Sequence, residues 1–420
     1  MATDVDVQFF SHLNGLVLSN NWGDMIRLLD ACLVNGVALS SVTSASIDEQ
    51  GDVHLTLFAP HKALLLQVVE LAGFEPTSLN QKYRIKGVPS DTQLILKPQV
   101  VIAETAVTTK GTGKLASLGY DIIFRDDKDV KRVYRAKNPT AQHPYIRVDE
   151  TISDGVNLYN SSYAKYAMVG LLEHMDHIDD YQDPNVLQLP FDPTNPTKNW
   201  KITGTGGACT RGWSKWYWAH GSLSGAGNGV MESNSPQNGN RSFLLCGDQE
   251  AFYLQRPHTL DKTYMYVSGT GLFESSLKSD VIPNWFLMSF LRERTAGVNE
   301  GFRDYMGATP LTAGMVPAQF FTTNYKEFEK MSGHITCNPI LQNFSTGILN
   351  TFAGTAIPAL TIPFYDTDLK LRGALKHINF LAKNLSTNSQ TTTPSIAENS
   401  MYVYLPCGTG FPVFYMGELE

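Results

Sequence analysis

The sequence predicts a mainly β protein with a β-sandwich-like core, one short N-terminal helix and a small inserted β-barrel-like module. Two observations predict this class. Short segments of alternating hydrophobic and polar residues recur along the chain with turn residues between them, a pattern typical of sandwiches and barrels. One segment near the N-terminus instead repeats its apolar residues with the period of a helix. The predicted parts are the N-terminal strand and docking helix at 1–38, the inserted module at 39–98, a β-rich core at 99–290 and a C-terminal β-rich region at 291–420.

The predicted helix occupies residues 21–37. Its apolar side chains are spaced three or four positions apart and so share one helix face: Trp22, Met25, Ile26, Leu29 and Leu33. Asn20 or Asn21 is placed to cap its start, and Gly36 to end it in the left-handed conformation. We expect Trp22, Met25, Leu29 and Leu33 to anchor the helix where it docks.

The predicted strands follow the helix in order. They are separated by turn residues such as Gly51, Gly73 and Pro89. The clearest segments are 53–58, 82–88, 93–97, 120–124, 131–135, 145–149, 163–172, 251–254, 264–267 and 401–405. Two other features interrupt this series, a short helix at 325–331 and an exposed loop at 386–395.

The composition limits the class of function. Of 420 residues, 17% are charged and 11% are aromatic, and the formal net charge is -7. We expect no nucleic-acid partner, because no basic excess is present to neutralise phosphates. We also expect no membrane partner and no secretory signal, because no apolar run approaches the roughly 20 residues that cross a bilayer and the N-terminus lacks a basic and apolar leader. The low charge fits a neutral polar exterior and equally fits surfaces buried between subunits.

One cluster carries metal-ligand chemistry. His174, Asp176 and His177 offer the imidazole and carboxylate groups that bind divalent ions. The apolar run before them, 164–172, indicates a strand, on which His174 and His177 would diverge. We therefore favour a solvated turn and expect no metal.

No enzyme signature is present. The glycine-rich segments 204–207 and 221–229 neither follow a strand nor open a helix, so neither is a dinucleotide fingerprint. The five cysteines are widely spaced and form no Cys-x-x-Cys pair, which favours buried thiols: Cys32, Cys209, Cys246, Cys337 and Cys407. We expect no catalytic residue and no cofactor.

Three tryptophans lie close together in the sequence, Trp213, Trp216 and Trp218. On a strand, Trp216 and Trp218 point to one face and Tyr217 to the other. Such a cluster fits an aromatic contact platform that stacks on sugar rings. It also fits a core or interface strand, which we favour.

Segment 28–36 resembles the helix near the start of a family of tailed-bacteriophage virion structural proteins, which reads Leu-Asp-Ala-Cys-Leu-Val-x-Gly. The resemblance continues in chain order and covers most of the sequence, except for residues 292–334. The small β module of that family is similar to residues 53–97, and further similar segments are 134–135, 145–150, 171–190, 245–254, 271–280 and 371–375.

The resemblance implies a non-enzymatic component of the virion. It implies a symmetric homo-oligomer that contacts other virion proteins in the tail, baseplate or head–tail neck. A protein that decorates the capsid surface is the first alternative. A carbohydrate-binding host-adsorption module, with a host surface glycan as partner, is the second, and a hydrolase or metal-dependent enzyme that uses His174, Asp176 and His177 is the third.

Overall fold

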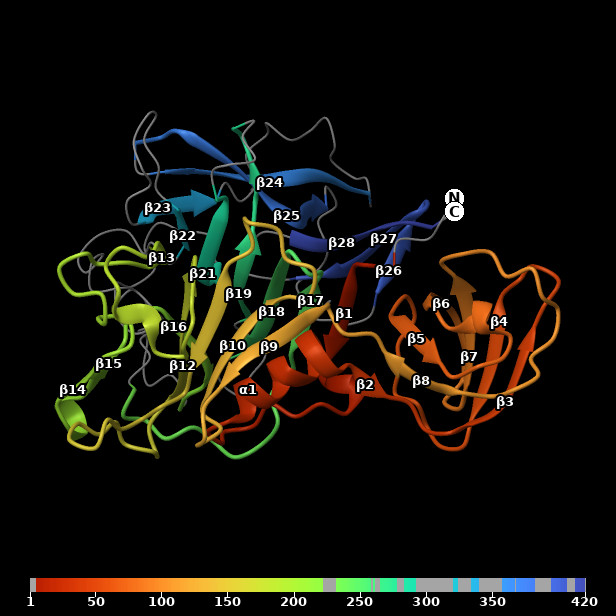
Figure 1. The fold of residues 1–420 in the computed structure, drawn as a ribbon, viewed down its shortest axis with the longest axis horizontal. Helices are drawn as coiled ribbons and strands as arrows, with labels where there is room; N and C mark the ends of the chain where they lie inside the picture. Colours follow the sequence, from red (N-terminus) through yellow and green to blue (C-terminus); the bar gives the residue numbers. More distant parts are fainter. Residues whose placement is uncertain are drawn as a thin grey trace.

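The computed structural model describes residues 5–221, 232–257, 260, 265–277, 283–291, 320–323, 334–339, 357–366, 368–381, 394–405 and 412–419. Within these ranges the predicted mainly β class is confirmed, since sheets make up most of the regular structure (Figure 1). Several predictions lie outside the described residues. They are the helix at 325–331, most of the loop at 386–395, most of the glycine-rich segment at 221–229, and Cys407.

The small module is a seven-stranded antiparallel sheet that curves into a half-barrel (Figure 1). In sheet order its strands are β2 (Val37–Ala38), β8 (Thr112–Leu115), β5 (Val68–Ala72), β6 (Lys82–Ser90), β7 (Gln93–Pro98), β4 (Val53–Leu57) and β3 (Val42–Ile47). The sheet extends past the predicted boundary at residue 98, because β8 returns to pair with β5 and places Leu115 opposite Val69. The alternation read from β4 matches its burial, with Val53, Leu55 and Leu57 all in the core.

A six-stranded sheet follows. Its strands are β9 (Tyr120–Arg125), β10 (Lys131–Ala136), β11 (Tyr145–Asp149), β12 (Lys165–Leu172), β13 (Gln188–Leu189) and β16 (Lys215–Ala219). Strand β12 is paired along both edges, with β11 on one side and β13 and β16 on the other. It is buried along its whole length, because its two faces pack in two different core clusters. A two-stranded ribbon, β14 (Ile202–Thr203) and β15 (Thr210–Arg211), lies beyond it.

The largest sheet has thirteen strands and joins the two ends of the chain. Its path is β1 (Gln8–Ser11), β17 (Leu244–Gly247), β18 (Ala251–Pro257), β19 (Met265–Leu272), β21 (Trp285–Leu291), β22 (Phe320–Thr323), β23 (His334–Pro339), β24 (Pro358–Asp366), β25 (Leu371–Leu381), β28 (Pro412–Glu418), β27 (Ser400–Tyr404) and β26 (Ser395–Ala397), and β20 (Glu274–Ser275) pairs with β25. Strand β1 therefore belongs to the core sheet and does not form a separate N-terminal unit with the helix.

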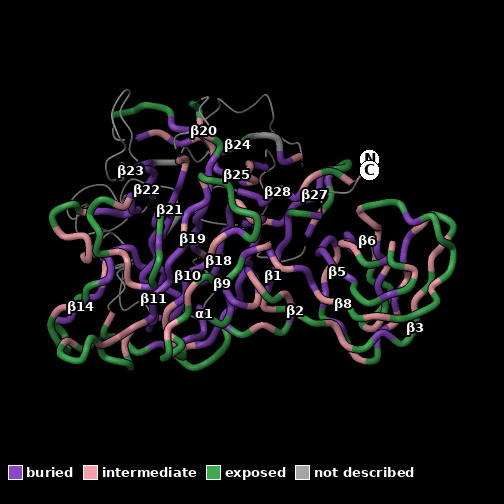
Figure 2. Tube along the Cα trace, in the orientation of Figure 1, coloured by how far each residue is buried: buried purple, intermediate pink, exposed green. Residues whose placement is uncertain are grey.

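The core is layered. One face of strands β17 to β22 packs against the six-stranded sheet, where the rings of Trp216 and Phe252 lie 6.0 Å apart. Their other face packs against the C-terminal strands, where Tyr253 lies 6.3 Å from Phe414. Figure 2 shows the result, a middle layer that is buried almost throughout. The predicted sandwich therefore has a third layer, built by the C-terminal strands.

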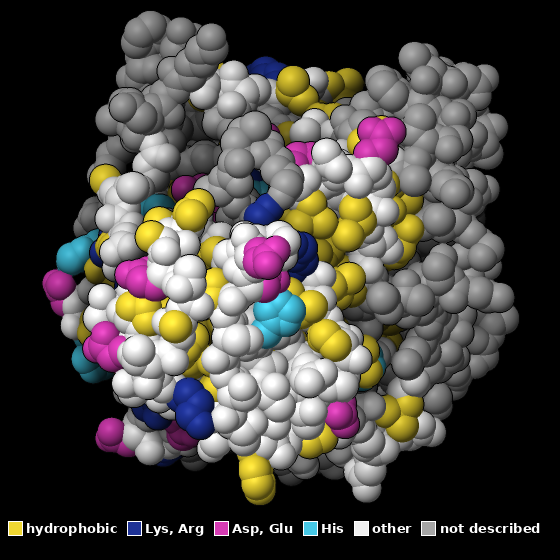
Figure 3. Space-filling view, turned by 90° about the vertical axis from the view of Figure 1, so that its right-hand side faces the viewer, with side chains coloured by type: hydrophobic (Ala, Val, Ile, Leu, Met, Phe, Trp, Pro, Cys, Tyr) yellow, Lys and Arg dark blue, Asp and Glu magenta, His cyan; other side chains and the backbone are white. Residues whose placement is uncertain are grey.

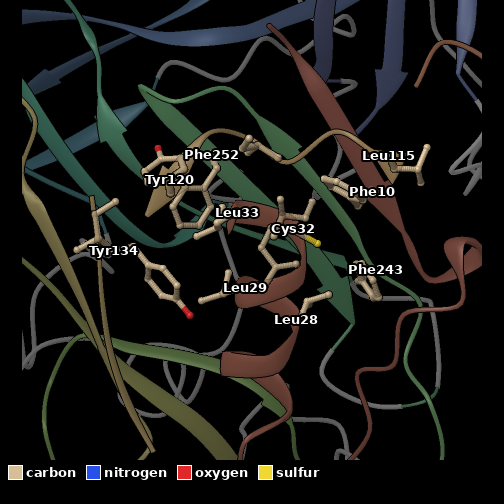
Figure 4. Packing of buried hydrophobic residues seen from close by; sticks show 14 of the residues in the cluster. Phe10, Leu28, Leu29, Cys32, Leu33, Leu115, Tyr120, Tyr134, Phe243 and Phe252 are labelled. Atoms are coloured by element: carbon tan, nitrogen blue, oxygen red, sulfur yellow. The ribbon is translucent and has the colours of Figure 1, made fainter. Parts of the chain in front are cut away.

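The N-terminal helix is shorter than predicted and is docked within its own chain. Helix α1 (Asp24–Leu29) continues as one wider π-helical segment, η2 (Asp30–Asn35). Gly36 ends it as expected, but not in the left-handed helical conformation, because its φ of 72° is combined with an extended ψ of -175°. Figure 4 shows its apolar side chains among aromatic residues from several strands: Phe10, Tyr120, Tyr134 and Phe252. The helix thus fills the space beside the sandwich.

Candidate functional site

The predicted docking residues all hold the helix in place. Met25, Leu29 and Leu33 are fully buried in the largest core cluster. Trp22 is half-buried, and its ring meets Trp218 edge-on at 5.8 Å while its Nε1 donates a hydrogen bond to the carbonyl of Ser161 at 3.0 Å. The surface on which this helix docks is therefore the interior of the same chain.

The three tryptophans of the expected aromatic platform are buried, with 1%, 0% and 0% of Trp213, Trp216 and Trp218 exposed. Trp216 and Trp218 face the core between the two sheets, and Tyr217 faces the cluster on the other side of β16. The alternation of side chains is as predicted, but both faces of this strand are covered. The cluster therefore presents no aromatic surface on which a glycan could stack.

The histidine-rich segment forms an exposed turn. The Nε2 of His174 lies 3.1 Å from Oδ1 of Asp176, whereas the Nδ1 of His177 accepts a hydrogen bond from the backbone of Asp179 at 3.3 Å. The two imidazoles thus have different partners. Among the residues that the structure describes, no group of three or more His, Cys, Asp and Glu side chains is placed to hold a metal ion.

The described cysteines are free and buried. Burial raises the pKa of the Cys32 and Cys246 thiols well above the ordinary value, and it raises the pKa of Cys337 to about 12 against the hydrogen bond with Thr322. These thiols therefore stay protonated at neutral pH and are poor nucleophiles.

A network of buried polar side chains joins the module to the core, and it is built around Gln8 of β1. The side-chain Oε1 of Gln8 accepts hydrogen bonds from the backbone N–H groups of Phe9 and Val68, each at 3.0 Å. Its Nε2 donates to the carbonyls of Val68 at 2.8 Å and Ala116 at 3.0 Å. The buried side-chain amide of Gln8 thereby makes the kind of hydrogen bonds that an additional strand between β1 and β5 would make.

Three more buried polar side chains complete this joint. Gln67 and Asn14 form a reciprocal amide pair, with N···O distances of 2.9 and 3.0 Å. Gln67 also donates to the carbonyl of Phe9 at 2.8 Å, and Arg84 donates to the carbonyls of Val7 and Leu66 at 3.1 and 2.8 Å. Because each of these groups is hydrogen-bonded across the boundary, the module is held in a defined orientation.

A cleft of about 610 Å³ opens beside the joint. Its walls come from all four predicted parts of the chain. The acidic side chains that line it are Asp6, Glu70, Asp248 and Glu250, and the basic ones are Lys82, Lys137, Lys376 and His377. Most of these charges pair with one another, as Lys82 does with Asp6 at 3.5 Å, whereas Lys137 has no acidic partner in the described part of the chain.

Several of the charged residues that line the cleft form an ion-pair network between β25 and the turn before β18. Asp248, in the turn between β17 and β18, accepts hydrogen bonds from the backbone of Glu250 and Ala251 and lies 2.7 Å from Nε2 of His377 on β25. Lys376 pairs with Glu250 and lies 3.5 Å from Asp248. Burial by itself raises the pKa of Asp248, but the hydrogen bond and charge of His377 and the charge of Lys376 lower it to about 2.

The ion pairs of this cleft join β25 to the turn between β17 and β18. His377 has its Nε2 on a carboxylate, and Ser117, which also lines the cleft, is not hydrogen-bonded to it in the described part of the chain. Sequence reasoning missed these residues because they come from segments far apart in the chain, although Asp248 lies inside the Gly-Asp segment at 245–254.

No family model and no curated protein matches this chain. No described helix has the length and apolar character needed to span a membrane.

The start of helix α1 is also held by a residue from a distant part of the sequence. Asn20 and Asn21 do not cap α1, because its N-cap residue is Gly23 in the left-handed conformation, with φ of 86° and no side-chain cap. Glu150, just after β11, supplies the cap instead. Its carboxylate accepts hydrogen bonds from the backbone N–H of Ile26 at 2.9 Å and from that of Gly23. Two donors at the helix start are thus satisfied from another part of the fold.

This cap predicts a pH dependence. Burial raises the pKa of Glu150 to about 7 from 4.5, against the hydrogen bonds from Gly23 and Ile26, which lower it. The folded chain therefore holds this proton more tightly than the unfolded chain does. The stability from this group is fully present below the unfolded pKa and is lost as pH rises through the folded pKa.

The test compares the wild type with Glu150→Gln, which cannot ionise. Between pH 5 and pH 8, the free energy of unfolding of the wild type should fall relative to that of the variant by about 2–3 kcal/mol. Urea unfolding at four pH values measures the difference. Parallel pH profiles for the two proteins would contradict the prediction.

Proposed function

We propose that the chain is a non-enzymatic structural subunit of a tailed-bacteriophage virion. We place it in the tail, baseplate or head–tail neck, as a symmetric homo-oligomer that also contacts other virion proteins. The proposal rests on the positions in the fold of the segments that resemble the phage virion family. Segment 28–36 forms most of the helix that is packed in the core, and segment 245–254 contains Asp248, which lines the cleft. Segment 371–375 begins β25, the strand that supplies His377.

The surface supports the same proposal. Figure 3 looks onto the end of the molecule formed by the module, where uncharged and hydrophobic side chains cover most of the described surface and charged ones are scattered. Phe58 is 80% exposed, and Val100 and Val101 are exposed on the same module. Exposed apolar side chains on a weakly charged surface are typical of interaction surfaces.

Decoration of the capsid surface remains the alternative within this class. The carbohydrate-binding alternative loses its supporting feature, because Trp213, Trp216 and Trp218 are interior residues. The enzyme alternative rests on His174, Asp176 and His177, which lie in an exposed turn.

The test is to locate the chain in purified particles. Antibodies raised against the recombinant chain should label intact or partly disrupted particles at one symmetric position, and cryo-electron microscopy should place its three-layered core in the same density. Labelling at the tail end supports the proposed location, and labelling over the head supports capsid decoration. Absence of the chain from particles by both methods would overturn the proposal.

A further inference from the structure

The turn between β24 and β25 exposes an unusual amount of apolar surface. We call residues 368–371 the hairpin tip. Leu369 is 78% exposed and Leu371 is 57% exposed. Leu277, which is also exposed, lies next to them, because the Oγ of the preceding Ser276 donates a hydrogen bond to the carbonyl of Leu371 at 3.1 Å. Three exposed leucines therefore lie near one another at one end of the C-terminal layer.

Hydrogen bonds to the side chain of Asp366 hold the hairpin tip in one conformation. The Oδ1 of Asp366, a fully buried residue, accepts hydrogen bonds from the backbone N–H groups of Asp368 and Lys370, each at 2.9 Å. Its Oδ2 accepts from the Nε of Arg372 at 2.8 Å. One carboxylate thus fixes both sides of the turn, so the exposed leucines are presented in a defined position.

Leu369 has a backbone conformation that leucine rarely adopts. Its φ is 62°, in the left-handed region that glycine, asparagine and aspartate tolerate far better than other residues. The chain therefore places a strained, exposed leucine where a polar residue would fold more easily. Strained residues that are held in place by their surroundings cluster at functional sites.

The charges around Leu369 indicate its partner. Asp368 and Lys370 flank it, both exposed and 3.5 Å apart from charge to charge. If two copies of the turn meet head to head about a two-fold axis, Leu369 packs on Leu369, and each Asp368 faces the other copy's Lys370. The hairpin tip is therefore complementary to itself in charge and in apolar surface, as an isologous contact requires.

We propose that the hairpin tip is a self-association site, and that its partner is the same turn of a second copy of this chain. The contact is centred on Leu369, with Leu371 and Leu277 beside it and the Asp368–Lys370 pairs at its rim. The inference rests on the proposed function in one respect, which is that copies of the chain associate.

The first test separates association from folding. Leu369→Asn removes the apolar side chain and introduces a residue that suits the left-handed backbone. The midpoint of thermal unfolding should stay the same or rise by about 1–3 °C. Self-association, measured by analytical ultracentrifugation of the full chain, should weaken at least tenfold.

The chain offers a matched control. Glu398, in the turn between β26 and β27, is an exposed residue with a φ of 53° and carries no apolar side chain. Glu398→Asn should relieve the backbone to a similar extent and leave association unchanged. Equal association of the wild type and both variants would overturn the proposal, as would an equal loss in both.

The second test uses charge reversal. Asp368→Lys and Lys370→Asp should each weaken association, because like charges then face each other across the two-fold axis. An equimolar mixture of the two variants should recover the wild-type affinity, since each copy then meets its complement. A mixture no tighter than its components would contradict a head-to-head contact.

The outcomes also separate this proposal from the proposed function. A chain found in particles, whose oligomers are insensitive to all hairpin-tip variants, would retain the proposed function and lose this interface. A chain absent from particles, whose association responds to these variants as described, would retain the interface and lose the virion role.

Discussion

Replacing Trp218 by alanine is expected to destabilise the chain by about 3–5 kcal/mol. The indole is fully buried in the core between the two sheets, and it also supports Trp22 at the start of the helix. Its removal deletes a large apolar side chain and leaves a cavity that the surrounding strands cannot easily fill. Urea unfolding of the wild type and the variant, followed by far-UV circular dichroism, measures the difference.

Phe58→Ala is the matched control for this substitution. Phe58 is also a large aromatic residue, but most of its surface is in contact with solvent, so its removal should change the unfolding free energy by no more than about 0.5 kcal/mol. If Trp218→Ala instead retained full stability and abolished adsorption to a glycan array, the interior position of this residue would be contradicted.

The second large effect is expected at the joint between the module and the core. Gln8→Ala removes one side chain that serves four backbone groups of Phe9, Val68 and Ala116. Those groups are buried, and each one left without a partner costs about 1–3 kcal/mol. We expect a total loss of about 3–5 kcal/mol, because water admitted to the joint recovers part of the hydrogen bonding.

The measurement for Gln8→Ala is hydrogen exchange as well as unfolding. Protection should fall first along β1 and β5, the two strands that the amide connects, while the interior of the six-stranded sheet keeps its protection. Gln81→Ala is the control, since Gln81 makes similar bonds to Ser78 and Val100 at the surface of the same module. An equal loss of stability in both variants would show that the joint has no special importance.

The parts of the fold that could be predicted from the sequence are those set by local pattern. The alternation in β4 and β16 and the apolar face of the helix are properties of a few consecutive residues, and the structure has them as expected. The pattern around Trp216 and Trp218 could not show that both faces of β16 are covered. That depends on a second sheet and on loops from elsewhere in the chain.

Long-range contacts account for what the sequence did not predict. The module continues to β8 because Leu115 lies opposite Val69 in the pairing of β8 with β5. The short segment 112–115 contains no local pattern that predicts this pairing. The cap of α1 comes from Glu150, more than a hundred residues away, so the nearby asparagines were the wrong choice. The cleft likewise gathers its charged side chains from separate segments, and the local patterns that singled out 53–97 and 245–254 could not show that Lys82 and Asp248 line one cleft.

The pairing of β1 with β17 has a consequence for biosynthesis. A ribosome releases β1 first, yet the strand that pairs with it is made only after the whole module and the whole six-stranded sheet. The module has its strands close together in sequence and can form early, whereas β1 must wait unpaired. Closure of the central layer is therefore a late event in translation, and a chain truncated before residue 244 would expose β1 as an open edge.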